Sequence, residues 1–400
     1  MADKKAANRR GNRRSSRKGR NGPLYAAVDL GTNNCRLLVA EPWGKSFRVV
    51  DSHSQIARLG EGLHETGRLS DAAIERALDA LKAIRKKLKN HGVGRVRCIA
   101  TEACRQAENG PDFIRRAQEE TGLTFKIINA KEEARLATIG CHDLMAEDAK
   151  TVLVVDIGGG STELSWVNAR VARDGGSHGL VKRAPIQDWT SLPLGVVTLH
   201  ERFGHLPEEE AFPAMLDYCG QVIRAWKGTE RVSRAMAQNG SHLIGTSGTV
   251  TCLAGVHLKL DRYRRDKVDG SWMSREEADA AVKLLRDLGL EGRATLPTIG
   301  EERASLMLSG CAIMQSIWDA FPGERLRVGD RGLREGLEPL LEQLRVHVAQ
   351  LRPREIDLPD QHRPVGAVHH DAGQRLVQRD RRVAVAHDAL AVAQRLGEGL

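Results

Sequence analysis

Residues 154–166 read VVDIGGGSTELSW. Apolar residues that favour β-strands lead into Asp156, three consecutive glycines follow, and strand-forming residues resume after Ser161, Thr162 and Glu163. Because glycine has no Cβ atom, such a turn lets backbone N–H groups come close to a ligand. A concave set of N–H groups binds anions well. The stretch therefore predicts a strand, an anion-binding turn and a second strand.

Residues 25–39, YAAVDLGTNNCRLLV, repeat part of this pattern about 127 residues earlier, with Asp29 in the place of the later aspartate. Two similar units indicate an internal duplication. Strands and helices alternate along the rest of the chain, which indicates an α/β fold. We therefore expect two similar domains with a cleft between them, and clefts of this kind favour ligand sites.

The acids at the strand ends carry a further implication. An aspartate would repel a phosphate unless a cation lay between them, so Asp29 and Asp156 suggest bound Mg²⁺. Each loop taken alone is also compatible with an ordinary hairpin turn. The pair, together with a third Gly/Thr turn at residues 245–249, favours a clamp on a phosphate chain. The Gly-Lys-Ser/Thr loop is absent, and so is a dinucleotide fingerprint followed by a helix.

The secondary structure can be predicted from periodicity and capping signals. Residues 70–88, SDAAIERALDALKAIRKKL, have apolar residues at a helical period, and Ser70 is a suitable N-cap. Strands are predicted at 25–29, 35–40, 47–58 and 125–130, and a strand that runs into a loop is predicted at 96–104. Helices are predicted at 111–122, 131–145, 207–226, 274–289 and 300–320, and a strand followed by a helix at 242–256 and 325–337.

Composition excludes some classes of protein. No window holds 18 consecutive apolar residues, and the N-terminus lacks the apolar core of a secretory signal, so we expect no membrane segment and a cytoplasmic protein. The seven cysteines are scattered, without a Cys-x-x-Cys pair, which is typical of reduced thiols rather than a disulfide framework or a zinc site.

The net charge of +9 comes almost entirely from residues 1–22, which hold nine Lys or Arg and one acid. This basic tail should be disordered. It is either a tether for a polyanion such as RNA, DNA or polyphosphate, or a solvated extension. Residues 341–400 have no Lys, no aromatic residue and no clean period, so we expect an unstructured tail there and assign it no function.

Seven stretches of the chain carry a resemblance to a known family: AVDLGTNNCRLLV, RCIATEACRQA, INAKEEARLATIG, VVDIGGGSTEL, LPLGVVTLHERF, GTSGTVTCLA and DRGLREGL. Over roughly residues 24–340 the chain resembles the exopolyphosphatase/guanosine pentaphosphate phosphohydrolase (Ppx/GppA) family, within the actin-like, sugar-kinase and Hsp70 ATPase superfamily. The resemblance implies two ribonuclease-H-like domains, at 23–136 and 137–320, with residues 321–340 closing the core and the active site in the cleft.

The resemblance also implies a reaction, the hydrolysis of a terminal phosphoryl group with Mg²⁺ or Mn²⁺. It gives Glu133 the role of general base and Arg105 a contact with phosphate, and it makes Asp156 and Glu163 hold the metal and the attacking water, beside Asp29. Removing such a base usually costs about 10²–10⁴-fold in rate. The predicted phosphate-binding residues are Gly31, Thr32 and Asn33 in the first loop, Gly158, Gly159, Gly160, Ser161 and Thr162 in the second, and Gly245 and Thr246 in the third turn.

Several alternatives remain at the level of sequence. Polyphosphate is the first substrate hypothesis because no element for reading guanine stands out, and guanosine pentaphosphate (pppGpp) is the second. Longer family members carry an additional helical HD-type domain, and we expect this chain to be a short two-domain form. Short polyphosphate chains or pppGpp suit such a form as substrates. A superfamily kinase and a non-catalytic polyanion-binding protein are further alternatives, and a homodimer is possible.

Overall fold

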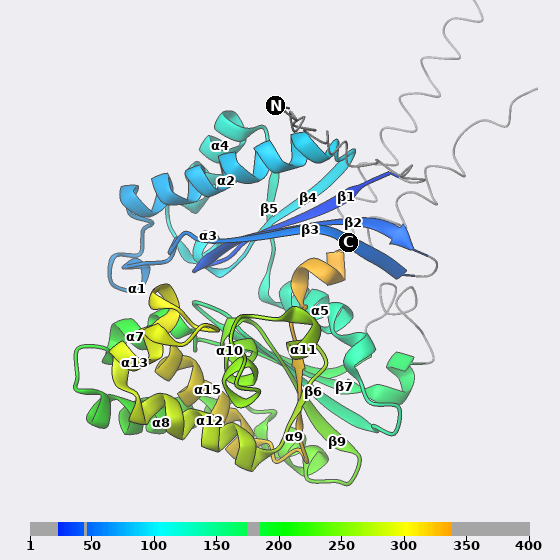
Figure 1. The fold of residues 1–400 in the computed structure, drawn as a ribbon, viewed down its shortest axis with the longest axis vertical. Helices are drawn as coiled ribbons and strands as arrows, with labels where there is room; N and C mark the ends of the chain where they lie inside the picture. Colours follow the sequence, from blue (N-terminus) through cyan, green and yellow to red (C-terminus); the bar gives the residue numbers. More distant parts are fainter. Residues whose placement is uncertain (1–22, 44–45, 174–184, 338–400) are drawn as a thin grey trace, which may run out of the picture. The chain divides into compact units, whose positions relative to one another are not determined.

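The computed structural model describes residues 23–43, 46–173 and 185–337 (Figure 1). The predictions for residues 1–22 and 341–400 lie outside these ranges. Two mixed β-sheets, each with helices packed against it, make up the described fold.

The first sheet has five strands in the order β3-β2-β1-β4-β5. Strands β1, β2 and β3 form an antiparallel meander, whereas β4 and β5 run parallel to β1. The strands are β1 (Tyr25–Leu30), β2 (Asn34–Trp43), β3 (Ser46–Ile56), β4 (Arg95–Ala100) and β5 (Phe125–Ile127), and the helices are α1 (Leu63–Thr66), α2 (Asp71–His91), α3 (Glu102–Gln106) and α4 (Gly110–Thr121).

Helix α2 begins where the sequence predicts. The Ser70 hydroxyl accepts the N–H of Ala73 at 3.2 Å, which satisfies one of the free donors of the first turn. The apolar stripe that includes Leu78, Leu81 and Ile84 is buried, and α2 covers the sheet together with α4 (Figure 1).

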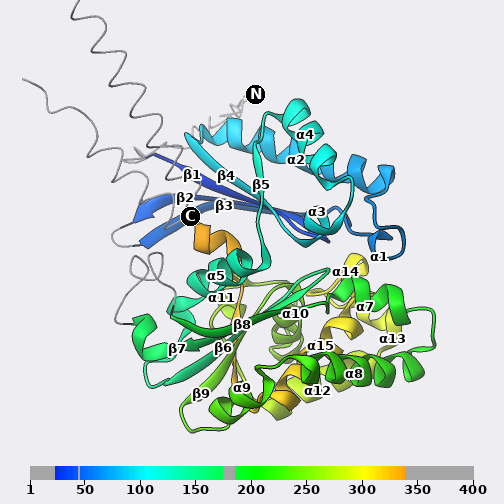
Figure 2. The ribbon, with the colours of Figure 1, turned by 180° about the vertical axis from the view of Figure 1, so that it is seen from behind.

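The second sheet has six strands in the order β10-β11-β9-β6-β7-β8. Helices α8, α12 and α15 pack together beside it (Figure 2). The strands are β6 (Thr151–Ile157), β7 (Thr162–Asn168), β8 (Ile186–Leu192), β9 (Ser241–Thr246), β10 (Trp272–Met273) and β11 (Leu326–Gly329). The helices are α7 (Val196–Phe203), α8 (Glu208–Ala225), α9 (Thr229–Met236), α10 (Gly248–His257), α11 (Arg265–Val268), α12 (Arg275–Asp287), α13 (Gly289–Thr295), α14 (Glu301–Ala304) and α15 (Met307–Ala320).

The two sheets have the same topology. The order β8-β7-β6-β9-β11 in the second sheet repeats β3-β2-β1-β4-β5 in the first, with β10 added at the edge. In both sheets the first hairpin is antiparallel and the fourth strand joins in parallel. This repetition supports the internal duplication and the predicted α/β fold of two domains.

Two predicted helices are shorter than expected. The helix predicted at 300–320 is broken into α14 and α15, because the carbonyl of Ala304 accepts a hydrogen bond from the buried Arg293 guanidinium at 3.2 Å instead of continuing the helix. The helix predicted from Lys131 to Met145 ends at Gly140 and is followed by a short 3₁₀ turn, His142–Leu144.

Helix α5 (Ala130–Gly140) contributes to two separate cores. Leu136 packs with Leu38 and other residues of the first sheet, whereas Ile139 packs with Val154 and other residues of the second. The predicted domain boundary after residue 136 falls inside this helix. Packing against both cores therefore fixes the position of helix α5 relative to the predicted cleft.

Backbone contacts hold α5 in place against helical residues 333–337. A Cβ atom on Gly140 would lie 1.9 Å from the carbonyl oxygen of Gly332, and one on Gly336 would lie 2.0 Å from the carbonyl oxygen of Leu136. Only glycine permits this approach, since real Cβ atoms essentially never come so close to another heavy atom.

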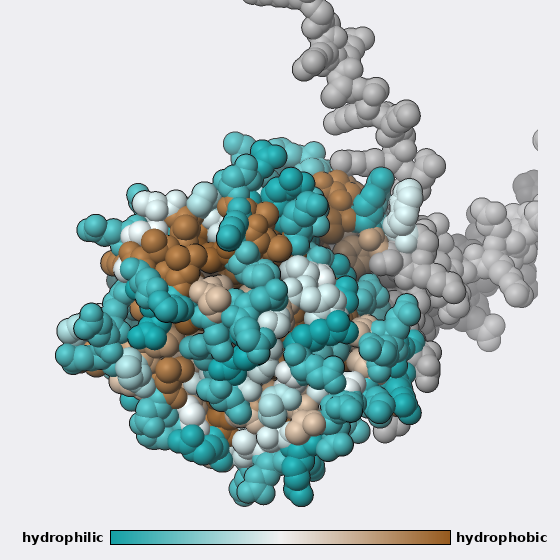
Figure 3. Space-filling model, turned by 60° about the horizontal axis from the view of Figure 1, so that its bottom comes forward, coloured by the Kyte–Doolittle hydropathy of each residue, from teal (hydrophilic) through white to brown (hydrophobic). Residues whose placement is uncertain are grey.

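The surface of the described residues gives no sign of a membrane span: no helix among them is both long and apolar enough to cross a bilayer. The face in Figure 3 is mostly hydrophilic, with hydrophobic residues gathered in patches between polar ones.

The glycine contact generates a stability prediction. Gly336→Ala should lower the free energy of unfolding by about 1–3 kcal/mol, because the added methyl group overlaps the Leu136 carbonyl and forces the backbones apart. Thermal unfolding followed by circular dichroism measures this loss. Gly94→Ala is the control, since a Cβ there meets no atom within 4 Å. A higher melting temperature for Gly336→Ala would contradict the packing, because alanine favours helices where no clash exists.

Candidate active site

A cavity of about 670 Å³ receives residues from both sheets. Strands β1 and β6 contribute their carboxyl ends and the loops that follow them, and the segments after β9 and β11 form a further wall. The predicted site residues that line it are Asp29, Gly31, Thr32, Asn33, Glu133, Asp156, Gly158, Gly159, Gly160, Ser161 and Thr246.

Four predicted residues do not line the cavity. Glu163 and Arg105 lie behind it and are described below. The Thr162 hydroxyl donates to the carbonyl of Leu194, and Gly245 packs where a Cβ would meet side chains at 3.0 Å, so these two support the loops.

The two glycine loops, which the sequence predicts to bind phosphate, have the same local geometry. The Gly31 N–H donates to the Asn34 carbonyl at 2.9 Å, and the equivalent Gly158 N–H donates to the Ser161 carbonyl at 2.8 Å. These paired turns confirm the strand–turn–strand units predicted from the sequence.

The loops also touch each other. A Cβ on Gly159 would lie 2.9 Å from the Thr32 Cβ, and one on Gly160 would lie 3.1 Å from the Thr32 hydroxyl oxygen. Within the described ranges, the N–H groups of Gly159 and Gly160 have no hydrogen-bond acceptor. The second loop therefore has free donors at the cavity, beside Thr32 of the first loop, and an anion requires such donors.

Several polar atoms in the cavity wall have no partner among the described residues. Each is buried, and buried polar atoms normally have one, so an ion, a water molecule or a polar ligand is the simplest explanation. They are Asn33 Oδ1, Asn34 Oδ1, His53 Nε2 and Ser247 Oγ.

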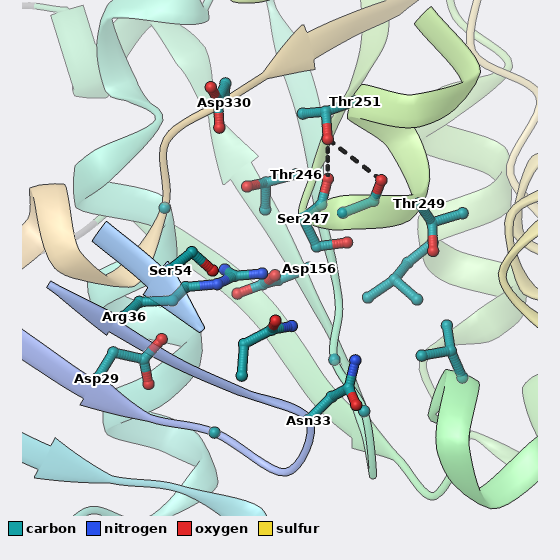
Figure 4. Close-up of a pocket in the computed structure, with 18 of the residues that line it drawn as sticks. Asp29, Asn33, Arg36, Ser54, Asp156, Thr246, Ser247, Thr249, Thr251 and Asp330 are labelled. Carbon is teal, nitrogen blue, oxygen red and sulfur yellow. Dashed lines mark hydrogen bonds between the residues drawn. The ribbon is translucent and has the colours of Figure 1, made fainter. Parts of the chain in front are cut away.

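The strand-end acids are paired differently in the two sheets. In register, Asp29 lies opposite Arg36 on β2, whereas Asp156 lies opposite Glu163 on β7. Figure 4 shows the Arg36 side chain extending toward Asp156 and Ser54. Arg36 was not predicted as a site residue, although it follows Asp29 by the same seven residues that separate Glu163 from Asp156.

The acids share a buried, mutually repulsive environment. Burial raises the pKa of Asp156 to about 6 and that of Glu163 to about 7. The negative charge of Asp156 also contributes to the raised pKa of Glu163. Burial also raises the pKa of Asp29, against the opposing charge of Arg36. Such a cluster favours the binding of a proton or a cation.

The predicted metal ligands are Asp29, Asp156 and Glu163. Among the described residues no group of three or more His, Cys, Asp or Glu side chains is arranged to hold a metal ion. Glu163 instead accepts the hydroxyls of Ser161 at 2.9 Å and Ser191 at 2.7 Å. Asp29, Asp156 and the unpartnered amide oxygen of Asn33 remain in the cavity wall. These hard oxygen donors suit Mg²⁺, which keeps several waters and uses few carboxylates.

Glu133 lies in the cavity wall on the first turns of α5, and only 8% of it is exposed. Asn129 caps this helix by accepting the N–H of Glu132 at 2.9 Å. Burial raises the pKa of Glu133 well above its usual range, the Glu163 carboxylate adds to the shift, and Arg105 opposes it.

Arg105 is placed behind Glu133 rather than in the cavity lining. It donates to Glu133 at 3.2 Å and to the Ile128 carbonyl at 2.7 Å, and it is also paired with Glu102. Glu102 itself lines the cavity and was not predicted, although it stands in the RCIATEACRQA stretch three residues before Arg105.

The wall formed by the second sheet contains a strained residue. Ser247 has φ 91°, which is rare for a residue with a side chain and typical of functional sites. The Thr251 hydroxyl fixes the turn by donating to the Ser247 carbonyl at 3.0 Å (Figure 4), and the Thr246 hydroxyl donates to the Arg331 carbonyl. Ser247 lies within the predicted 245–249 turn but was not itself identified.

The remaining wall carries residues for which the sequence gave no signal. Tyr263, Arg265 and Arg303 line the cavity from segments without a recognisable motif. Arg265 donates to the Asp330 carbonyl at 2.6 Å, and its guanidinium lies 3.3 Å from the Glu335 carboxylate. Tyr263, Arg265 and Arg303 are far from the glycine loops in sequence and reach the same cavity only in the folded chain.

Two mixed sheets of repeated topology, with glycine loops and acids meeting at a cavity, agree with the predicted α/β fold of two domains. The model of the Ppx/GppA phosphatase family matches residues 38–344. The chain therefore belongs to the Ppx/GppA phosphatase family, as the resemblance predicted.

Individual relatives agree with this assignment. The chain is 32% identical over 320 residues to the guanosine-5'-triphosphate,3'-diphosphate pyrophosphatases of Aeromonas salmonicida and Aeromonas hydrophila, a match that covers 79% of this chain. The chain spans only 59% of the length of these relatives.

Solved structures extend the similarity to the fold. The crystal structure of the Aquifex aeolicus member of the Ppx/GppA family has a TM-score of 0.64 and 26% identity, covering 81% of this chain and 98% of that one. An exopolyphosphatase from Cytophaga hutchinsonii has a TM-score of 0.70 at 24% identity, covering 80% of this chain and 98% of that one, and so agrees in fold.

We predict that removing the charge of Asp156 stabilises the folded chain, and that the size of this gain depends on pH. The folded chain ionises Asp156 only above about pH 6, whereas the unfolded chain does so near 3.8, so stability is lost as the pH rises through this window. Asp156→Asn should raise the free energy of unfolding at pH 8 by on the order of 1–3 kcal/mol. The gain should shrink as the pH falls to 5.

Chemical unfolding without added metal at the two pH values measures this effect. Glu119→Gln, at an exposed position on α4, is the control and should change stability little at either pH. A loss of stability for Asp156→Asn at pH 8 would mean that the carboxylate is compensated in the folded protein and would contradict the repulsive cluster.

Proposed function

We propose that the chain is a metal-assisted phosphohydrolase that releases terminal orthophosphate from inorganic polyphosphate. The observation that carries the proposal is the contact between the two glycine loops at a cavity whose wall includes the buried Glu133. Anion donors and a carboxylate with a raised pKa at one cavity suit the attack of water on a phosphoric anhydride.

In this proposal the loops hold the terminal phosphate. The N–H groups of Gly159 and Gly160 donate to its oxygens, and Thr32 closes the other side. The Ser161 hydroxyl donates its single proton to Glu163 at 2.9 Å, so it supports the loop and does not donate to the phosphate. Donors already in position cost no reorganisation as charge develops in the transition state.

The residues that would hold the metal are Asp29 and Asp156, with Glu163 acting through Ser161 and water. Bound there, Mg²⁺ or Mn²⁺ would neutralise charge on the phosphate oxygens. Arg36 is a fixed cation beside the same carboxylates and limits their repulsion when the metal is absent.

Glu133 acts as the general base. The water oxygen bonds to the terminal phosphorus, the bond from phosphorus to the bridging oxygen breaks, and Glu133 takes the water proton. A raised pKa makes this carboxylate a stronger base than an ordinary glutamate. Arg105 orients the carboxylate at 3.2 Å, and its predicted contact with phosphate would use a guanidinium N–H that does not donate to Glu133, Glu102 or the Ile128 carbonyl.

Five arginines line the cavity, and with the free N–H groups of the second glycine loop they favour an anionic ligand such as a phosphate chain. They are Arg36, Arg265, Arg303, Arg331 and Arg334.

A second candidate is the 5'-phosphohydrolysis of pppGpp. The names of the two Aeromonas relatives favour it. Tyr263 also favours it, because this aromatic residue lines the cavity and is 38% exposed, which leaves ring surface for a base. Both candidates use the same chemistry on a terminal phosphate.

Glu133→Gln tests the proposed base. The substitution keeps the shape of the side chain but removes its basicity, so kcat should fall by about 10²–10⁴-fold while the protein stays folded. Phosphate release is measured with and without Mg²⁺ on tripolyphosphate, long polyphosphate, pppGpp and ATP. The ratio of kcat/KM for polyphosphate and pppGpp decides between the two candidates.

Glu132→Gln is the matched control, since Glu132 is the neighbouring acid on the same helix and pairs with Arg135 at 2.8 Å. It should retain nearly full activity. Undiminished phosphate release by Glu133→Gln would remove Glu133 from the mechanism. Transfer of phosphate from ATP to an acceptor, with no release from polyphosphate or pppGpp, would favour a kinase.

A further inference from the structure

The first phosphate loop is held from behind by residues 57–62. The N–H groups of Ala57 and Arg58 both donate to the Asn33 carbonyl, at 2.9 and 3.0 Å. The Gly60 N–H donates to the Thr32 carbonyl at 2.9 Å, and a Cβ on Gly60 would lie 2.3 Å from a Thr32 methyl carbon. A shift of this segment would therefore move the first loop.

The second phosphate loop is held in the same manner by the start of α7. The N–H groups of Val196 and Val197 donate to the carbonyls of Gly158 and Gly159, at 3.0 and 2.9 Å. A Cβ on Gly195 would lie 2.1 Å from the Gly159 carbonyl oxygen, so the two backbones are in direct contact. A shift of α7 would therefore move the second loop.

These two supporting segments are joined to each other through Glu201, near the end of α7. The Gly62 N–H donates to Glu201 Oε1 at 2.8 Å, across 139 residues of sequence. Gly62 has φ 70°, a conformation that favours glycine. Arg202 makes a second contact nearby, with its Nη2 atom 3.2 Å from His64 Nε2.

Glu201 is incompletely satisfied at this junction. Its second oxygen, Oε2, is buried and has no hydrogen-bond partner among the described residues. A buried carboxylate oxygen without a partner opposes folding, so stability alone does not explain an acid here. Among the residues that the structure describes, the hydrogen bond of the Glu201 side chain is the one from Gly62, and it joins the supports of the two loops.

We propose that Glu201 is a positioning residue whose bond to Gly62 sets the separation of the two phosphate loops. This inference rests on the proposed function, because the loops are taken to grip one phosphate chain. The hydrogen bond from Gly62 needs an acceptor oxygen at the distance from the backbone that a glutamate side chain reaches. A glutamine keeps that acceptor, whereas aspartate is too short and alanine has none.

The first measurement is kinetic, with tripolyphosphate and Mg²⁺ as the probe. Glu201→Ala and Glu201→Asp should raise KM by about tenfold or more, because loops at the wrong separation cannot grip both sides of the phosphate chain. Glu201→Gln should remain within about twofold of the wild type. Glu209→Ala, an exposed acid in the first turn of α8, is the control and should change nothing.

The second measurement is a distance distribution, which needs no activity. Spin labels at Ala83→Cys on α2 and Lys283→Cys on α12 report the separation of the two halves by electron paramagnetic resonance. Both sites are exposed, and the seven native cysteines are buried. The distribution should broaden or shift in the alanine and aspartate variants, and the glutamine variant should restore it.

The outcomes separate the two proposals. If the wild type releases no phosphate from any substrate, the proposed function fails, and the distance distributions still test the role of Glu201. Unchanged distributions in both the alanine and aspartate variants would overturn the inference, as would an unchanged KM in an active enzyme. Broadening in the glutamine variant as well would assign the effect to charge rather than to the Gly62 bond and would also overturn it.

Discussion

The contact between Gly159 and Thr32 is the constraint on which the site depends. A side chain on Gly159 would overlap Thr32, so the approach of the two loops requires bare backbone. This contact brings together the ends of β1 and β6, each of which carries an aspartate. The acids then share a buried region, where their charges raise each other's pKa. A site built in this way favours a cation and, beside it, the anion that the cation neutralises.

The duplicated units have the same backbone but different chemistry. Position 36 in the first unit is an arginine, and its counterpart in the second unit is Glu163. The first unit thus brings a cation opposite Asp29, and the second brings an acid opposite Asp156. Helix α5 then adds Glu133 from a position held by both cores. The asymmetry places a buried carboxylate and anion donors in one cavity of a nearly symmetric frame.

Much of this could be predicted from local patterns. Strand, turn and glycine signals identified both loops, and Ser70 marked the start of α2. Glu133, which lines the cavity, was identified only through the family resemblance of the INAKEEARLATIG stretch. Contacts between distant segments could not be predicted in this way. Spacing along the chain could not reveal that Arg105 is held behind Glu133 by Glu102, or that Glu163 turns toward Ser161 and Ser191. The break before α15 depends on Arg293, which is close to Ala304 only in the folded protein.

The central claim is that both loops and the strand-end acids bind one phosphate chain and its metal. The most direct test is anomalous diffraction from crystals of the Glu133→Gln variant grown with Mn²⁺ and tripolyphosphate. The account predicts a manganese peak coordinated by Asp29 or Asp156, directly or through water, with a phosphate on the N–H groups of Gly159 and Gly160. Tripolyphosphate and manganese bound away from both loops, or an empty cavity at saturating ligand, would contradict it.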